Sequence, residues 1–102
     1  MDHVLMQICK IAEKYNADKV ILFGSRARGD NSPVSDYDIA VIGEKMSDLE
    51  KANFCLDVEE VETLKKIDVA FITEDIKDDF TGNIMKEGVV VYEKTRDKIN
   101  EF

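Results

Sequence analysis

The sequence "KVILFGSRARGDNSPVSDYDIAVI", residues 19–42, contains two apolar segments separated by a polar stretch with two glycines and two arginines. "KVILF" (Lys19–Phe23) is short, apolar and rich in branched side chains, which predicts a buried strand. The small polar residues, proline and glycine between Ser25 and Ser35 predict mostly turn. "DYDIAVI" (Asp36–Ile42) predicts a second strand, so a cationic turn connects two strands.

Two aspartates open the second predicted strand. Residues two apart on a strand point to the same side, so Asp36 and Asp38 are expected to project together, with Tyr37 turned away. A carboxylate beside a buried strand costs free energy unless it is paired or binds a metal ion. Asp68 precedes the apolar run "VAFI" in the same way, and adjacent second and third strands would bring three carboxylates together.

Three close carboxylates repel one another, and a divalent cation removes this repulsion because it supplies the largest positive charge in the site. Oxygen ligands favour Mg²⁺ or Mn²⁺. Taken singly, each aspartate is more typical of a solvated strand end, and a lone Asp-x-Asp is a weak signal.

The turn between the two strands has features of a phosphate-binding site. Gly24 allows a close approach of the backbone to a ligand, and Ser25 offers a hydroxyl at a position where a helical turn can begin. Arg26 and Arg28 can donate charge-assisted hydrogen bonds to phosphate. Gly-Ser alone fits an ordinary turn with two surface arginines. The joint arrangement of this turn with three strand-opening aspartates indicates a site for phosphates and metal ions.

The remaining chain predicts three helices and two further strands. Apolar residues at helical spacing predict a first helix from about Asp2 to Tyr15, and Ser47 with Glu50 resembles a capping box that opens a second helix to about Lys65. Seven residues of that second helix are candidates for burial: Leu49, Ala52, Phe54, Leu56, Val58, Val61 and Leu64. "IDVAFI" (Ile67–Ile72) predicts the third strand.

A short helix is expected over Ile76–Lys86, closed by Gly88 as its C-cap, and "VVVYE" (Val89–Glu93) predicts the last strand. The charged tail, residues 95–102, is expected to fray or to add a last helical turn. The order helix, strand, strand, helix, strand, helix, strand over 102 residues predicts one domain, residues 1–102. The expected fold class is α/β (α+β), with a single mixed four-stranded sheet and helices on one face.

Composition excludes several classes of function. The formal net charge of −8 argues against a general affinity for nucleic acids, which depends on basic residues that neutralise phosphates. No apolar run approaches the roughly 18 residues of a membrane span, and the acidic N-terminus lacks signal-peptide character, so we expect a cytoplasmic protein without a membrane partner. Cys9 and Cys55 are expected to be buried free thiols.

The stretch "GSRARGDNSPVSDYDIAV" resembles the signature of the minimal nucleotidyltransferases, within the DNA polymerase beta-like superfamily. The signature consists of Gly-Ser, a gap, Asp-x-Asp and a third acid on a later strand. The resemblance implies the nucleotidyltransferase fold. It also implies that Gly24, Ser25, Arg26 and Arg28 contact a nucleoside triphosphate, and that Asp36, Asp38 and Asp68 are catalytic and hold two Mg²⁺ ions. Asp68 would also help to activate the attacking hydroxyl.

Small members of this family occur as antitoxins beside a helical toxin protein, and the resemblance implies transfer of AMP from ATP to a hydroxyl, such as a tyrosine, of that partner. The alternative is a binding module that neutralises the toxin by contact. Two acidic runs, "DVEEVE" (Asp57–Glu62) and "EDIKDD" (Glu74–Asp79), offer an acidic surface for it. Residues Val89–Tyr92 are candidates for a sheet edge that pairs with a second copy. The sequence does not specify the nucleotide base.

Overall fold

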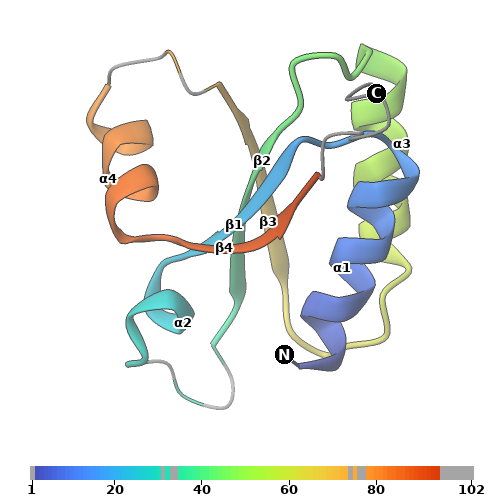
Figure 1. The fold of residues 1–102 in the computed structure, drawn as a ribbon. Helices are drawn as coiled ribbons and strands as arrows, with labels where there is room; N and C mark the ends of the chain where they lie inside the picture. Colours follow the sequence, from blue (N-terminus) through green and yellow to red (C-terminus); the bar gives the residue numbers. More distant parts are fainter. Residues whose placement is uncertain (1, 31, 33–34, 74, 76–77, 95–102) are drawn as a thin grey trace, which may run out of the picture.

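A computed structural model describes residues 2–30, 32, 35–73, 75 and 78–94 of the chain, and within them four strands form one sheet flanked by helices (Figure 1). The elements follow in the order α1 (His3–Lys14), β1 (Lys19–Phe23), α2 (Ser25–Arg28), β2 (Tyr37–Ile42), α3 (Asp48–Glu59), β3 (Ile67–Ile72), α4 (Asp79–Glu87) and β4 (Val89–Glu93). The bounds predicted for the first, third and fourth strands are confirmed. The predicted tail, residues 95–102, and the predicted start of the last helix, residues 76–77, lie outside the described residues.

The sheet is mixed, as the sequence predicts, and its strand order is β3-β2-β1-β4. β1 pairs antiparallel with both β2 and β4, whereas β2 pairs parallel with β3. A parallel pair cannot be joined by a tight turn, and α3 provides the longer crossover between β2 and β3. The strand order places β1 and β2 in the centre, where most of their residues are buried, and leaves β3 and β4 at the edges.

The main hydrophobic core lies between the sheet and the helices α1 and α3, which run side by side on one face (Figure 1). Alternate strand residues point to this face, including Val20 on β1 and Ile39 on β2, and α3 adds the fully buried Phe54. The helix α4 adds contacts on the opposite face, where Ile84 packs beside Ile21 and Ala40. The two longest helices share one face as expected, and α4 differs because its apolar residues complete a second, smaller core.

Helix ends follow the capping residues in the sequence. The predicted capping box is confirmed, because the Ser47 hydroxyl accepts a hydrogen bond from the Glu50 N–H (3.1 Å) and the Glu50 carboxylate accepts one from the Ser47 N–H (2.9 Å). Asp78 caps α4 by accepting a hydrogen bond from the Thr81 N–H (2.7 Å), and Gly88 is its C-cap as predicted. Gly88 has an extended backbone conformation. Glycine is favoured there because a Cβ would collide with the Ile21 side chain.

The prediction for α3 was wrong in its length and in part of its buried face. The helix ends at Glu59 and not near Lys65, since its last turn contains acidic residues and no basic residue to interact favourably with the helix dipole. Of the candidates for burial, only two are buried within the helix: Phe54 and Val58. Leu49, Leu56 and Leu64 are 70%, 58% and 105% exposed.

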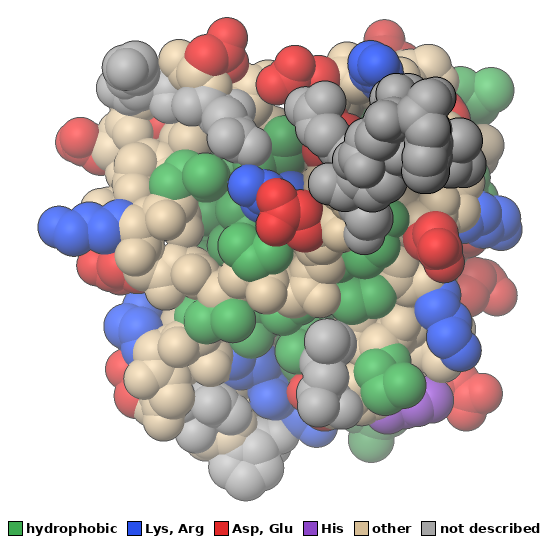
Figure 2. Space-filling model, viewed as in Figure 1, with side chains coloured by type: hydrophobic (Ala, Val, Ile, Leu, Met, Phe, Trp, Pro, Cys, Tyr) green, Lys and Arg blue, Asp and Glu red, His purple; other side chains and the backbone are tan. Residues whose placement is uncertain are grey.

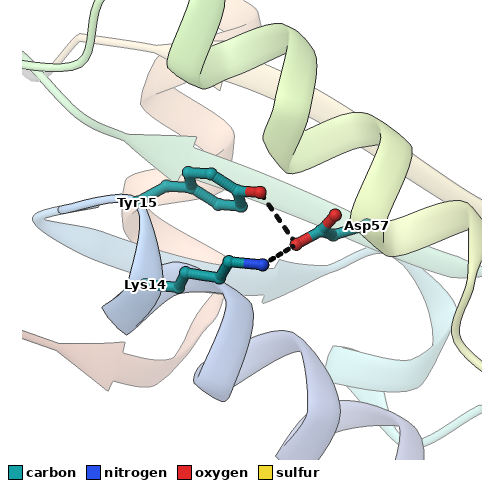
Figure 3. Close-up of polar contacts among 3 residues, drawn as sticks. All are labelled: Lys14, Tyr15 and Asp57. Atoms are coloured by element: carbon teal, nitrogen blue, oxygen red, sulfur yellow. Dashed lines mark hydrogen bonds and ion pairs between the residues drawn. The ribbon is translucent and has the colours of Figure 1, made fainter.

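A polar contact connects α1 with α3 at the surface of the core (Figure 3). The Asp57 carboxylate of α3 accepts hydrogen bonds from Lys14 Nζ (2.9 Å) and from the Tyr15 hydroxyl (2.9 Å), at the end of α1. These hydrogen bonds, with that from Lys14 the larger cause, lower the pKa of Asp57. The contact therefore connects the end of α1 to α3 at the protein surface.

The edge strand β4 crosses the face shown in Figure 2, where hydrophobic side chains gather in the middle and charged ones surround them. Val89 and Val90 of this strand are 47% and 49% exposed. Neither Cys9 nor Cys55 forms a disulfide among the described residues, and both are only partly buried, not buried as predicted. The Cys9 thiol donates a hydrogen bond to the Val91 carbonyl (3.3 Å). Among the residues that the structure describes, no helix has the length and apolar character needed to cross a membrane.

The Phe54 side chain should carry much of the stability of the main core. It is fully buried and meets the Phe71 ring edge-on at 5.8 Å. Phe54→Ala is expected to lower the free energy of unfolding by about 3–5 kcal/mol, because it leaves a cavity that the helix cannot close. Urea denaturation measures this, with Leu56→Ala on the exposed side of the same helix as the control, for which we expect about 0.5 kcal/mol or less. Equal losses would contradict this account of the core.

The Asp57 contact predicts a pH dependence of stability. A carboxyl group whose pKa is lowered by folding stabilises the fold above its unfolded pKa, about 4, and loses that effect as the pH falls through its folded value. The wild type should therefore exceed Asp57→Asn in free energy of unfolding at pH 7, and the difference should shrink below about pH 4. Urea titrations of both proteins across this range test the expectation. A difference that grows towards low pH would contradict it.

Candidate functional site

The polar residues highlighted by the sequence meet at one end of the sheet. β1 ends there at Phe23, and β2 and β3 begin there. In the strand register, Asp38 lies opposite Phe23 of β1 on one side and opposite Asp68 of β3 on the other. Asp38 and Asp68 therefore project from the same face of the sheet, the face that also carries α4.

Asp38 sits in an unfavourable electrostatic environment. Its pKa is raised, first by partial burial and then by the negative charges of Asp68 and Asp36, while Arg28 acts in the opposite direction. Like charges near a partly desolvated carboxylate favour its neutral form. A cation bound beside Asp38 would relieve this strain, so the position is suited to a positively charged ligand.

Gly24 has a conformation and a location that suit only glycine. Its φ of 75° and ψ of −156° lie in a region that residues with a Cβ rarely adopt. A Cβ at this position would also collide with Oδ2 of Asp38. The backbone between β1 and α2 thus packs directly against the Asp38 carboxylate, so the turn and Asp38 lie at the same place in the fold.

Lys66 contacts both Asp36 and Asp68. Its backbone N–H donates a hydrogen bond to Asp36 Oδ1 (3.3 Å), and its ammonium group lies 3.4 Å from Asp68 Oδ1. Within the described part of the chain, no group of three or more carboxylate, thiol and imidazole side chains is arranged to hold a metal ion. Lys66 was not among the predicted site residues. Its position directly before "IDVAFI" and two residues from Asp68 indicates a positive charge beside the third predicted aspartate.

The turn residues divide into two groups. Ser25 opens α2, and its carbonyl accepts a hydrogen bond from the Asp30 N–H (3.1 Å). Arg28 is exposed, forms an ion pair with Asp30 (3.2 Å), and lies close enough to Asp38 to influence its pKa. Arg28 and Gly24 therefore lie near the Asp38 carboxylate.

Arg26 points to the other side of the turn. Its Nε and Nη2 atoms donate hydrogen bonds to the Ser35 carbonyl (3.2 and 2.9 Å), and its guanidinium lies 4.0 Å from the centre of the Tyr37 ring. Tyr37 is buried on the core face, as its spacing predicts, and donates a hydrogen bond to Asp2 (2.8 Å). Arg26 thus holds the loop before β2 against the core.

The three aspartates at this end of the sheet have the oxygen donors of a divalent-cation site, but this structure does not gather them into one. Asp36, Asp38 and Asp68 carry the hard oxygen atoms that Mg²⁺ prefers, and the pKa of Asp38 is raised by its partial burial and then by the negative charges of Asp68 and Asp36. The ammonium group of Lys66 forms a solvent-exposed ion pair with Asp68 at this end of the sheet.

Comparisons with known proteins identify the family. The family model "Polymerase beta, Nucleotidyltransferase" matches residues 6–97, so the chain belongs to this family of nucleotidyltransferases. None of the curated protein sequences is similar enough to match the chain.

Two solved structures share the fold. One is a crystal structure of a toxin-antitoxin with AMP-PNP, with a TM-score of 0.65, 16% identity, and 89% of this chain and 74% of that chain covered. The other is a proposed nucleotidyltransferase from Sulfolobus solfataricus, with a TM-score of 0.56, 21% identity, and 89% and 81% covered. The expected nucleotidyltransferase fold is confirmed.

The close approach of Gly24 to Asp38 can be tested by comparison with Gly29. Both glycines have positive φ, but a Cβ at Gly29 would meet no atom within 4 Å. Gly29→Ala is expected to cost about 1 kcal/mol of stability from backbone strain alone. Gly24→Ala should cost about 3 kcal/mol, because the strain is greater and the Asp38 carboxylate must move. Chemical denaturation of the two variants provides the test, and equal costs would refute the close approach.

Proposed function

We propose that this protein transfers AMP from ATP to a hydroxyl group of a partner protein, with a tyrosine as the acceptor. The observation that carries the proposal is the in-register placement of Asp38 and Asp68 on one sheet face, against the Gly24 turn. The chain belongs to a nucleotidyltransferase family, which supports nucleotidyl transfer as the reaction class. The structural neighbour that contains AMP-PNP supports ATP as the nucleotide.

The residues would divide the work as follows. Gly24, Ser25 and Arg28 would contact the triphosphate, with Arg26 holding the turn in place. Asp36, Asp38 and Asp68 would hold two Mg²⁺ ions, or Mn²⁺. When bound, these ions would neutralise the phosphates and activate the attacking hydroxyl. Arg28 would donate charge-assisted hydrogen bonds to the phosphates. These would stabilise the negative charge that builds up on the leaving pyrophosphate in the transition state.

The reaction forms a bond between the hydroxyl oxygen of the acceptor and the α-phosphorus. The O–H bond of the hydroxyl breaks, and its proton would pass to the Asp68 carboxylate. The bond from the α-phosphorus to the bridging oxygen breaks, and pyrophosphate leaves with its electron pair. Asp68 is about half exposed, with 48% of its side chain accessible, so an acceptor hydroxyl can approach it from solvent. The chain needs no covalent intermediate for this displacement.

We further propose that the partner is a helical toxin and that the protein acts as its antitoxin. The support is the structural similarity to a protein solved as a toxin-antitoxin with AMP-PNP. The family resemblance of "GSRARGDNSPVSDYDIAV" points the same way. Neutralisation by contact alone is the competing function, and the acidic residues 57–62 beside the end of α3 would be its surface.

The transfer reaction predicts a dependence on the strand-opening aspartates. With Mg²⁺, the candidate toxin and ATP labelled on its α-phosphate, the toxin should become labelled, whereas ATP labelled on its γ-phosphate should leave it unlabelled. Asp38→Asn and Asp68→Asn should each lower the rate by about 100-fold or more, because several kcal/mol of charge stabilisation are lost. Asp48→Asn, an exposed aspartate on α3 at the other end of the sheet, is the matched control.

Two outcomes would count against this function. Transfer at the wild-type rate by the Asp38 and Asp68 variants would remove these residues from the reaction. Variants that transfer nothing but still neutralise the toxin fully would establish contact as the function. Circular dichroism spectra like that of the wild type must accompany either result, so that unfolding is not mistaken for loss of a catalytic group.

A further inference from the structure

A cavity of about 270 Å³ opens between the end of β1 and α4. Gly24 and Arg28, the turn residues nearest to Asp38, line one side of it. The cavity is therefore continuous with the proposed triphosphate site and lies on the same face of the sheet. Its volume is close to the lower end of the roughly 300–1,000 Å³ typical of small-molecule sites.

Two phenylalanines form an aromatic wall of this cavity. Phe23 ends β1 and Phe80 lies in the first turn of α4, and their rings meet edge-on with centroids 5.8 Å apart. Phe80 is 51% exposed, whereas Ile84, one turn further along α4, is buried and contributes an apolar lining. An exposed aromatic ring beside an apolar lining suits a flat, uncharged ring system.

Polar groups from the same helix complete the cavity. Asn83 and Glu87 are four residues apart on α4, so they occupy one side of the helix, and both line the cavity. An amide presents both a donor and an acceptor, and a carboxylate accepts hydrogen bonds from N–H groups. Together they can read the edge of a flat ring that carries an exocyclic amine and ring nitrogens.

We propose that this cavity binds the purine base of the nucleoside triphosphate, with the base against Phe23 and Phe80 and its polar edge towards Asn83 and Glu87. The inference rests on the proposed nucleotidyl transfer and adds the base specificity that the sequence did not specify. A purine is favoured over a pyrimidine because its two fused rings cover more of the aromatic wall. The Gly24 turn and Arg28 then lie on the side where the phosphates continue towards Asp38.

Binding measurements on the full chain test this assignment. Calorimetry with Mg²⁺ and ATP, GTP, UTP or inorganic tripolyphosphate should show ATP and GTP binding about tenfold more tightly than UTP and tripolyphosphate. Phe80→Ala should weaken ATP binding about tenfold, as expected for loss of stacking, and should leave tripolyphosphate binding unchanged. Met85→Ala is the matched control, because Met85 is an exposed apolar residue of α4 that does not line the cavity.

The polar edge has a test of its own. Replacing Asn83 and Glu87 together by alanine should weaken ATP binding about tenfold but have little effect on purine riboside triphosphate, which lacks the exocyclic amine. Equal losses for the two nucleotides would overturn the assignment of this edge.

The outcomes separate this inference from the proposed function. Similar affinities for ATP, UTP and tripolyphosphate, or a Phe80→Ala variant that weakens tripolyphosphate as much as ATP, would overturn the base site and leave nucleotidyl transfer standing. A chain that binds none of the four ligands, or whose ATP binding is unaffected by Arg28→Ala, would overturn the proposed function and the base site with it.

Discussion

The parallel pairing of β2 with β3 brings two negative charges side by side, and the architecture of this end of the sheet accommodates that repulsion. Asp38 lies in register with Asp68, and the raised pKa of Asp38 records its partial burial and the nearby negative charges. Arg28 and Lys66 supply positive charge around the pair. In the proposed function, bound cations and an anionic nucleotide would make this electrostatically costly arrangement favourable.

The two faces of the sheet differ in how completely helices cover them. The face covered by α1 and α3 contains most of the buried apolar residues and gives the domain its stability. The opposite face carries Phe23, Asp38 and Asp68, and α4 covers it only in part, through Ile84. A close-packed interior has no room for a ligand, whereas a partly covered face leaves a cavity beside a rigid support.

Most of the fold could be predicted from local patterns. Short apolar runs with branched side chains marked the strands, and Ser47 with Glu50 marked a helix start, because both signals depend on neighbouring residues. The length and buried face of α3 could not be predicted in the same way. Its leucines at 49 and 56 look like core residues, but only its contacts with the sheet decide that Phe54 and Val58 are buried.

The candidate site was predictable only as a list of residue types and short-range relations. The two-residue spacing of Asp36 and Asp38, and a glycine at the end of β1, follow from the sequence itself, since strand geometry has a period of two. The tertiary structure alone decided that β3 lies beside β2 and that Arg26 packs on Tyr37. It also placed Arg28 close enough to Asp38 to influence its pKa, and α4 where it forms a cavity next to the turn. These features depend on contacts between residues far apart in the chain, which no local pattern encodes.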